Sequence, residues 1–170
     1  MADIRRVGDL EIAEDLQYHQ RAWTLERIGW SVMLLVIVAA LAGLLGPGPL
    51  SNAVAGRQGS TLWVEYNRFE RYQSPTVLRV HFSSSAAKQG KVRLYLNRDF
   101  IQQVRVQRIE PEPESVAVGS QSTAYTFNVL RQKGPAIVVF HYEPNTQGSV
   151  PIHVGLHGGP RLSFSQFLYP

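Results

Sequence analysis

The sequence predicts a mainly β protein in which a single N-terminal transmembrane helix is followed by an antiparallel β-sandwich. Three observations favour this fold class. No charged residue lies between Ile28 and Gly56, and such a run is long enough to cross a bilayer. The residues from 51 onward contain eight short segments in which apolar and polar residues alternate, as they do in half-buried strands. The chain has no cysteine, so packing alone must hold the sheets together.

Residues 1–27 are expected to form a cytoplasmic amphipathic helix that begins at about residue 10. Asp9 precedes it at a position suited to a helix cap. Glu11, Glu14 and Asp15 follow in the early turns, where the positive end of the helix dipole favours anions. One stripe with three- and four-residue spacing consists of Ile12, Leu16, His19, Trp23, Arg27 and Trp30. This stripe would lie on the membrane surface or dock on a partner, and the acidic turns favour a partner.

Residues 28–46 are predicted to form the transmembrane helix. They are apolar apart from Ser31, and at about 1.5 Å per residue they nearly match the roughly 30 Å hydrocarbon layer. The alternative is a cleaved signal peptide, because Ala53-Val54-Ala55 has the small-x-small form of a signal-peptidase site. The run is longer than the usual apolar core of a signal peptide, and 27 residues precede it. We therefore expect the segment to be retained as an anchor.

The ends of the apolar run indicate the membrane interfaces and the orientation. Residues 46–49, Gly-Pro-Gly-Pro, should stop the helix, because proline removes a backbone donor and glycine permits positive φ. Candidate interface residues at the other end are Trp23, Trp30, Arg21 and Arg27. Only Arg57 is basic near the second end, so the N-terminus is expected in the cytoplasm. The absence of cysteine and of Asn-x-Ser/Thr sequons favours a bacterial inner membrane with the C-terminal domain in the periplasm.

Small residues in the apolar run suggest a helix-packing face. Ala39/Gly43 and Ala42/Gly46 form two small-xxx-small pairs, which allow a neighbouring helix to approach closely. Ordinary membrane-helix composition is the alternative, because alanine and glycine are common in such helices. No ionisable residue lies within the run, which argues against transport or proton relay.

A linker at residues 47–60 precedes the predicted periplasmic sandwich at residues 61–170. The alternating segments are 61–67, 76–83, 91–97, 101–109, 123–130, 136–142, 149–156 and 162–169. This pattern favours an immunoglobulin-like or fibronectin-like sandwich. Expected inward-facing residues are Leu78, Val80, Phe82, Val92, Leu94, Leu96, Tyr125, Phe127 and Val129. The sequence EPEPES at residues 110–115 is expected in an exposed loop or edge.

Basic side chains at outward positions are candidate contacts for a partner or for lipid. They are Arg79, His81, Lys91, Arg93 and Arg105. Residues 51–170 contain 13 Lys or Arg against 7 Asp or Glu, whereas residues 1–27 contain 4 against 6. A basic sheet face near a bilayer could bind lipid phosphates or an acidic protein surface, and a solvated face is the alternative. Nucleic acid is not an expected partner outside the cytoplasm.

No pattern of catalytic residues is present. Asp99 is the one aspartate beyond the apolar run, no nucleophile elbow surrounds a serine, and no phosphate-binding loop follows a strand. His141, His153 and His157 suggest a metal site, but Glu143 is the nearest carboxylate in the sequence that could complete it. We therefore expect no enzymatic activity, no metal and no cofactor.

The leader LEIAEDLQYHQRAWTLERIGW at residues 10–30, one span and GPGPLS at residues 46–51 resemble a group of small, uncharacterised bacterial single-pass inner-membrane proteins. The resemblance covers residues 10–51. It implies bacterial origin and single-pass topology, with a short acidic cytoplasmic leader and a periplasmic all-β domain, and it implies no substrate.

Two functions are compatible with these features. The preferred hypothesis is a non-catalytic accessory or assembly subunit of a larger inner-membrane protein complex, whose span packs against a membrane protein partner. The alternative is a membrane-tethered periplasmic module that binds a soluble protein or a small ligand. Association with a second copy of the chain is compatible with both.

Overall fold

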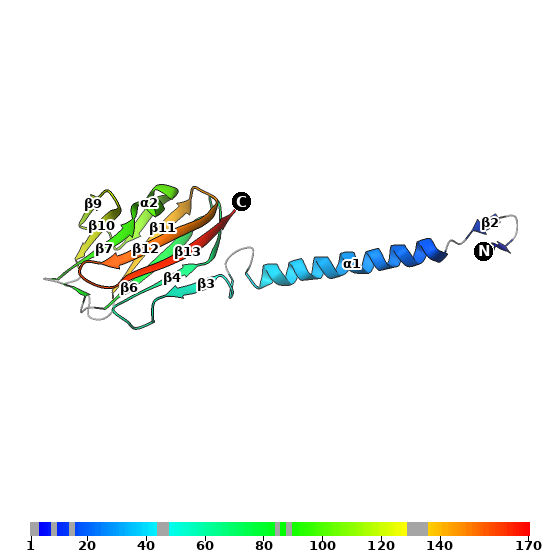
Figure 1. Ribbon diagram of the computed structural model, residues 1–170, viewed down its shortest axis with the longest axis horizontal. Helices are drawn as coiled ribbons and strands as arrows, with labels where there is room; N and C mark the ends of the chain where they lie inside the picture. Colours follow the sequence, from blue (N-terminus) through cyan, green and yellow to red (C-terminus); the bar gives the residue numbers. More distant parts are fainter. Residues whose placement is uncertain are drawn as a thin grey trace. The chain divides into compact units, whose positions relative to one another are not determined.

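The computed structural model describes residues 4–7, 10–13, 16–43, 48–83, 86–87, 90–128 and 136–170, with side chains from residue 22 onward. These residues form two compact units, Met1–Ala40 and Leu41–Pro170. The first unit contains a short hairpin and one long helix, and the second contains the β-sandwich (Figure 1). The predicted fold class is confirmed.

The N-terminal unit begins with a hairpin, where the sequence had suggested the start of a helix. Strands β1 (Ile4–Val7) and β2 (Leu10–Ala13) pair antiparallel, and helix α1 spans Leu16–Leu41. The two residues between the strands, Gly8 and Asp9, are of types that favour tight hairpin turns. Helix α1 begins at Leu16, about six residues after the predicted start at residue 10. The predicted cytoplasmic helix and the predicted transmembrane helix are continuous, because α1 has no break between residues 27 and 28.

Helix α1 also ends earlier than predicted. Its last residue is Leu41, whereas the sequence predicted a helix through Gly46. The segment Ala22–Leu41 contains 20 residues, and its most apolar 18-residue window has a mean hydropathy of 1.8. At about 1.5 Å per residue this length still matches the hydrocarbon layer, so α1 is a candidate membrane anchor.

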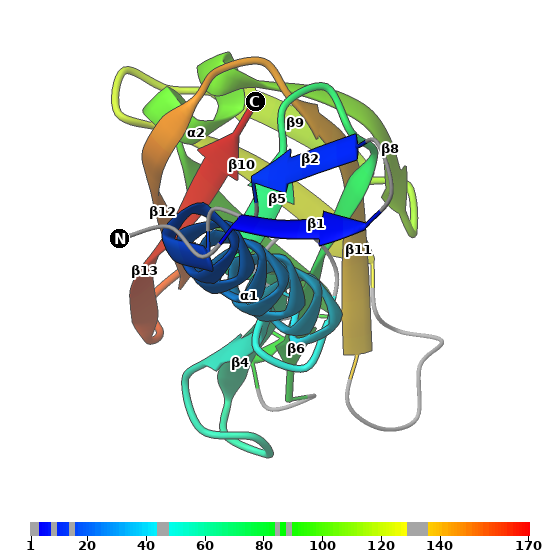
Figure 2. The ribbon, with the colours of Figure 1, turned by 90° about the vertical axis from the view of Figure 1, so that its right-hand side faces the viewer.

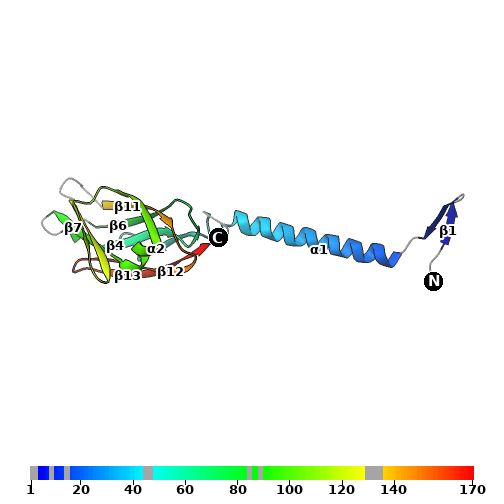
Figure 3. The ribbon, with the colours of Figure 1, turned by 90° about the horizontal axis from the view of Figure 1, so that it is seen from above.

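Two sheets make up the sandwich, and Figure 3 shows them as separate layers. The five-stranded sheet contains, in spatial order, β3 (Asn52–Ala55), β4 (Leu62–Asn67), β6 (Thr76–Phe82), β11 (Ala136–Pro144) and β8 (Val104–Glu110). The six-stranded sheet contains β5 (Phe69–Arg71), β13 (Arg161–Tyr169), β12 (Gly148–Leu156), β7 (Lys91–Asn97), β10 (Ser122–Asn128) and β9 (Ser115–Val118). All pairs within them are antiparallel except β5 with β13.

The strand order is immunoglobulin-like. In the five-stranded sheet, the spatial order β4-β6-β11-β8 corresponds to the A-B-E-D order of an immunoglobulin sheet. In the six-stranded sheet, β13-β12-β7 corresponds to G-F-C. Strand β10 lies beside β7 at the position of C′, but the chain reaches it after β8. Viewed end-on in Figure 2, β12 and β13 lie apart from β8 and β11.

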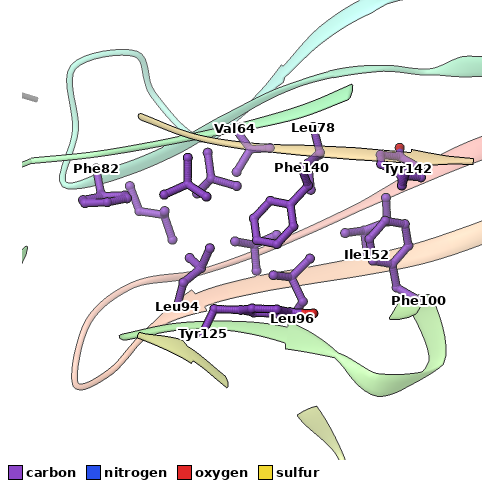
Figure 4. Close-up of a cluster of buried hydrophobic side chains, with 14 of the residues drawn as sticks. Val64, Leu78, Phe82, Leu94, Leu96, Phe100, Tyr125, Phe140, Tyr142 and Ile152 are labelled. Atoms are coloured by element: carbon purple, nitrogen blue, oxygen red, sulfur yellow. The ribbon is translucent and has the colours of Figure 1, made fainter. Parts of the chain in front are cut away.

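The core fills the space between the two sheets. Large buried side chains from both sheets meet there, including Phe82, Phe140, Leu78, Leu94 and Leu96 (Figure 4). Phe140 and Tyr125 contact edge to face with ring centroids 5.3 Å apart, a geometry that aromatic pairs prefer. The expected inward residues are buried, except Val129, which lies outside the described residues.

Within the sandwich unit, four elements were not expected from the sequence. Strand β3 lies within the predicted linker, β5 and β9 are short edge strands, and helix α2 (Arg98–Gln103) replaces the start of the predicted strand 101–109. Phe100 is buried, and Ile101 and Val104 also pack against the core. Their spacing fits one helical turn leading into β8, so the local apolar pattern was compatible with both elements.

Candidate functional site

Helix α1 exposes apolar side chains around its whole circumference. None of the most hydrophobic window of Ala22–Leu41 is buried. The exposed large side chains on this segment are Trp23, Leu25, Ile28, Trp30, Val32, Met33, Leu34, Leu35, Val36, Ile37, Val38 and Leu41. A helix that is apolar all round requires lipid or another protein to cover it.

The predicted interface residues lie within α1, between residues 21 and 30. The guanidinium carbon of Arg27 lies 4.2 Å from the centre of a Trp23 ring, which is a cation–π contact. Ser31 Oγ donates a hydrogen bond to the Arg27 carbonyl oxygen (2.8 Å). Trp30 is exposed, and the side chain of Arg21 lies outside the described residues. This end of α1 therefore combines indole rings with a basic head group, as interface segments do.

The predicted small-residue face is not a continuous helix face. Ala39 lies within α1, whereas Ala42 and Gly43 follow its last residue, Leu41. Gly46 lies outside the described residues. Ala42 and Gly43 therefore lie beyond the last helical residue, and their packing against a neighbouring helix stays a prediction.

Ala42 and Gly43 instead take part in a closed turn before the sandwich. The Leu50 N–H donates to the Ala42 carbonyl oxygen (3.1 Å). Gly43 has a φ of 90°, and a Cβ atom there would lie 2.6 Å from the Gly48 Cα atom. Such an approach is open only to glycine, so the two glycines allow the chain to close on itself.

The segment that resembled a signal-peptidase site is part of the sandwich. Asn52–Ala55 forms β3 and pairs antiparallel with β4. Ala53 is buried. Cleavage after Ala55 would remove a paired strand from the five-stranded sheet. This pairing therefore favours retention of the apolar segment over the alternative of a cleaved signal peptide.

The predicted basic residues do not share one face. Arg79, His81 and Arg105 belong to β6 and β8 in the five-stranded sheet, whereas Lys91 and Arg93 belong to β7 in the six-stranded sheet. Since the sheets face one another across the core, their outward residues lie on opposite sides of the sandwich. The single basic face expected from the sequence is therefore corrected to two separate faces.

On the five-stranded sheet, His81 is packed among its neighbours and is not exposed. It is buried, and its ring stacks on Trp63 at a centroid distance of 3.5 Å. Its Nε2 atom lies 3.5 Å from Glu65 Oε2 without a hydrogen bond. Next to it, a depression of about 360 Å³ is lined by Asn52, Ala53, Val54, Glu65, Tyr66, Asn67, Val77 and Arg79.

On the six-stranded sheet, outward polar groups pair mainly with one another. Lys91 Nζ lies 2.7 Å from Glu114 Oε1, while Arg93 has no ion-pair partner among the residues that the structure describes. The Tyr95 hydroxyl is 2.9 Å from His157 Nδ1, and His153 Nδ1 is 2.8 Å from Ser163 Oγ. Each of these histidines is held by a hydroxyl group.

The three histidines considered as metal ligands are not brought together. His153 is in β12 and His157 follows this strand, whereas His141 is in β11 of the other sheet. Within the described part of the chain, no group of three or more His, Cys, Asp or Glu side chains could hold a metal ion.

One buried polar network joins the two sheets. The Tyr142 hydroxyl donates to Gln166 Oε1 (2.8 Å), and Gln166 Nε2 donates to the Asn67 carbonyl oxygen (2.8 Å). Nearby, the Glu70 carboxylate accepts hydrogen bonds from Thr76 and from Asn67. Burial raises the pKa of Tyr142, the Glu70 charge acts in the same direction, and the hydrogen bond to Gln166 opposes them. The network is enclosed, which indicates a structural role.

No protein-family model matches the chain, and the comparison with curated proteins finds no relative. The proposals below therefore depend on the geometry of the chain itself.

Proposed function

We propose that the protein is a non-catalytic accessory or assembly subunit of a larger bacterial inner-membrane complex. Helix α1 anchors it, the N-terminal hairpin lies in the cytoplasm, and the sandwich lies in the periplasm. A partner membrane protein contacts the anchor, the sandwich or both. The proposal includes no cofactor and no enzymatic step.

The observation that carries the proposal is the all-round apolar exposure of α1. Its large side chains are exposed on every side, and in water such a surface would be strongly unfavourable. A bilayer covers it, and a neighbouring helix can cover part of it. The orientation is supported by Arg27 and Trp23 near the N-terminal end of the apolar segment.

The outward residues of the sandwich support a binding role without chemistry. Tyr142, Gln166 and Asn67 pair with one another in the core network. His153 and His157 each lie beside a hydroxyl group, and His81 stacks on Trp63. Catalysis usually needs a base and a nucleophile or metal gathered at one site. The described residues offer surfaces suited to protein contact.

Affinity purification of the full chain from native membranes in mild detergent tests the subunit hypothesis. We expect a defined set of membrane proteins to co-purify at constant ratio, and the complex to elute well above the size of the 19.0 kDa chain with its micelle. Elution of the chain alone, with no membrane protein enriched over a control purification, would contradict a stable subunit role.

A tethered binding module is the second candidate, and one observation favours it. The depression of about 360 Å³ on the five-stranded sheet has Asn52, Asn67, Glu65 and Arg79 among its lining residues, and a concave site with a few polar groups suits a small ligand. Under this alternative, the Arg79→Gln variant should lose ligand binding while the membrane proteins that co-purify stay unchanged.

A further inference from the structure

The chain enters the sandwich at a residue that is locked to the turn between β4 and β5. Ser51 is fully buried. Its carbonyl oxygen accepts a hydrogen bond from the Arg68 N–H (2.6 Å), and its hydroxyl donates to the Phe69 carbonyl oxygen (3.0 Å). The entry point and the start of β5 are therefore held together as one piece.

Basic and aromatic side chains surround this entry point. We call this group the entry rim, and it consists of Leu50, Arg68, Phe69, Arg71, Tyr72 and Phe167. Leu50 is 54% exposed and Phe167 is 49% exposed, Arg68 and Arg71 are exposed, and Phe69 and Tyr72 are half-buried. The Phe167 N–H donates to the Arg68 carbonyl oxygen (2.8 Å), and Phe167 pairs with Phe69 across the parallel strands. The start of β3 and the end of β13 lie at this end of the sandwich (Figure 1).

The outward charge of the entry rim is basic. Glu70 lies between its two arginines in the sequence, but its carboxylate is buried and accepts hydrogen bonds from Asn67 and Thr76. Neither Arg68 nor Arg71 has an ion-pair partner among the described residues. The rim thus presents two free guanidinium groups beside exposed aromatic and aliphatic surface.

The closed turn keeps the entry rim close to the end of the apolar helix. Residues 42–50 connect Leu41 to Ser51, and the hydrogen bond from Leu50 to Ala42 brings the two ends of this connection together. A fully extended connection of this length could reach about 30 Å, but the closed turn uses almost none of that reach. Ala42, the residue after the last residue of α1, therefore lies beside Leu50 of the entry rim.

We propose that the entry rim is a lipid-docking surface that binds the outer surface of the anionic bilayer in which α1 is embedded. The proposal rests on the anchor role of α1. Arg68 and Arg71 bind lipid phosphates, while Phe167, Phe69 and Tyr72 lie at the level of the head groups, where aromatic rings are favourable. A purely acidic protein surface would complement the arginines but would leave Leu50 and Phe167 without apolar contact, so the composition of the rim favours lipid.

The proposal is tested with the full-length chain in nanodiscs. The chain has no native cysteine, so a single introduced cysteine can be labelled specifically. A fluorescent dye is attached after Ser149→Cys, since Ser149 is exposed and is the cross-strand partner of Phe167. A second preparation carries the dye after Gln58→Cys, in the exposed turn between β3 and β4 at the other end of β3. Quenching by lipid with a spin-labelled head group is compared in phosphatidylcholine and in phosphatidylcholine containing about one-third phosphatidylglycerol.

We expect strong quenching at position 149 and little at position 58, with the difference largest in the anionic nanodiscs. Replacing both rim arginines, Arg68→Gln with Arg71→Gln, should lower the docked population roughly fivefold for each arginine. The matched control is Arg57→Gln with Arg161→Gln, which removes the same charge from exposed positions at the opposite end. Added salt at about 0.5 M should act like the rim substitutions, because it screens exposed charges.

Several outcomes would overturn the proposal. Equal quenching at the two positions, no dependence on phosphatidylglycerol, or an equal effect of the control pair would each show that the rim does not dock on lipid. If the variant with Arg68→Gln and Arg71→Gln changes which proteins co-purify with the chain while quenching stays constant, the entry rim contacts a protein instead of lipid. Thermal unfolding of both variant pairs checks that the fold is intact. Failure of the anchor is seen separately, because the protein would then leave the membrane in a carbonate wash.

Discussion

Neighbouring residues on one strand of the sandwich have very different environments, and β11 illustrates this. Phe140 and Tyr142 point into the core, whereas Ile137 points outward and is 43% exposed. Phe140 contacts Tyr125, and Tyr142 contacts Phe100 at a centroid distance of 5.4 Å. The alternation of a strand therefore assigns neighbouring apolar residues to opposite environments.

Phe140→Ala should lower the free energy of unfolding by about 3–5 kcal/mol, because it removes a fully buried ring and leaves a cavity. Ile137→Ala is the control on the outward side of the same strand and should cost under about 1 kcal/mol. Urea unfolding in detergent, followed by the fluorescence of Trp63, measures both variants. Equal losses for the two variants would contradict the assignment of Phe140 to the core.

The buried phenol of Tyr142 should make the sandwich sensitive to alkaline pH. An unfolded tyrosine titrates at about pH 10, and burial raises the pKa of Tyr142 in the folded chain. The unfolded state therefore loses its proton first, so the stabilisation is complete below about pH 10 and falls as the pH rises above it. Tyr125 is affected in the same direction by burial.

Tyr142→Phe separates this effect from other alkaline titrations. The variant should be about 1–3 kcal/mol less stable at pH 8, because Gln166 loses its hydrogen-bond partner. Its stability should then fall less steeply than that of the wild-type chain between about pH 9 and 11. Urea unfolding at several pH values measures both slopes, and equal slopes would show that the Tyr142 phenol does not contribute.

At the level of elements, the sequence predicted most strands because their alternation extends over six or more residues. The bounds of β4, β6, β7, β11, β12 and β13 lie within two residues of the expected segments. β3 and β5 have four and three residues, too few to show a period. The formation of β5 also depends on a distant partner, because it pairs with Phe167–Tyr169.

The division of the basic residues between two faces was also beyond local sequence patterns. Each strand showed which of its residues point outward, but the strand does not show to which sheet it belongs. β6 and β7 follow one another in the chain and lie in different sheets. Likewise, the outward alternation of His81 did not reveal that Trp63 covers its ring. Both features depend on tertiary packing.

The closed turn between α1 and β3 can be tested through Gly43. Gly43→Ala should weaken the turn by about 1 kcal/mol or more, because alanine disfavours positive φ and its Cβ atom would collide with Gly48. The Leu50 amide donates to Ala42 across this turn, so its hydrogen exchange should become several-fold faster.

Gly59→Ala is the matched control for that measurement. Gly59 also has a positive φ, 79°, but no atom lies within 4 Å of its Cβ position. It should leave exchange of the Leu50 amide unchanged. Unaltered exchange in Gly43→Ala would show that the turn tolerates a side chain and would restore the helix-packing interpretation of Gly43.

At the level of the whole molecule, the chain combines one apolar helix with a sandwich that has its own core. The long apolar run and the alternating segments both follow from composition, and the sequence was sufficient to predict this division. Local patterns did not predict the N-terminal hairpin or the division of the outward residues between the two sheets.

Topology reporters test the proposed orientation. A reporter that is active only in the periplasm should work when fused after Pro170 and should fail when fused before Asp9. The reason is the concentration of basic residues on the N-terminal side of the apolar segment. The unfused chain should remain in the membrane after a carbonate wash. Reversed reporter activity, or a soluble product beginning near Gly56, would contradict the proposed topology.

The parallel pairing of β5 with β13 has a consequence for biogenesis. β5 is an edge strand whose neighbour in the sheet is β13, and Phe69 pairs with Phe167. After β5 has been synthesised, about a hundred further residues must be added before its partner strand β13 is complete. Contacts between residues that are so far apart in the sequence form slowly. Until then the rim-forming segment has no sheet to join. If the sandwich lies in the periplasm as proposed, it should cross the membrane unfolded, and the pair of β5 with β13 should form only after β13 has emerged.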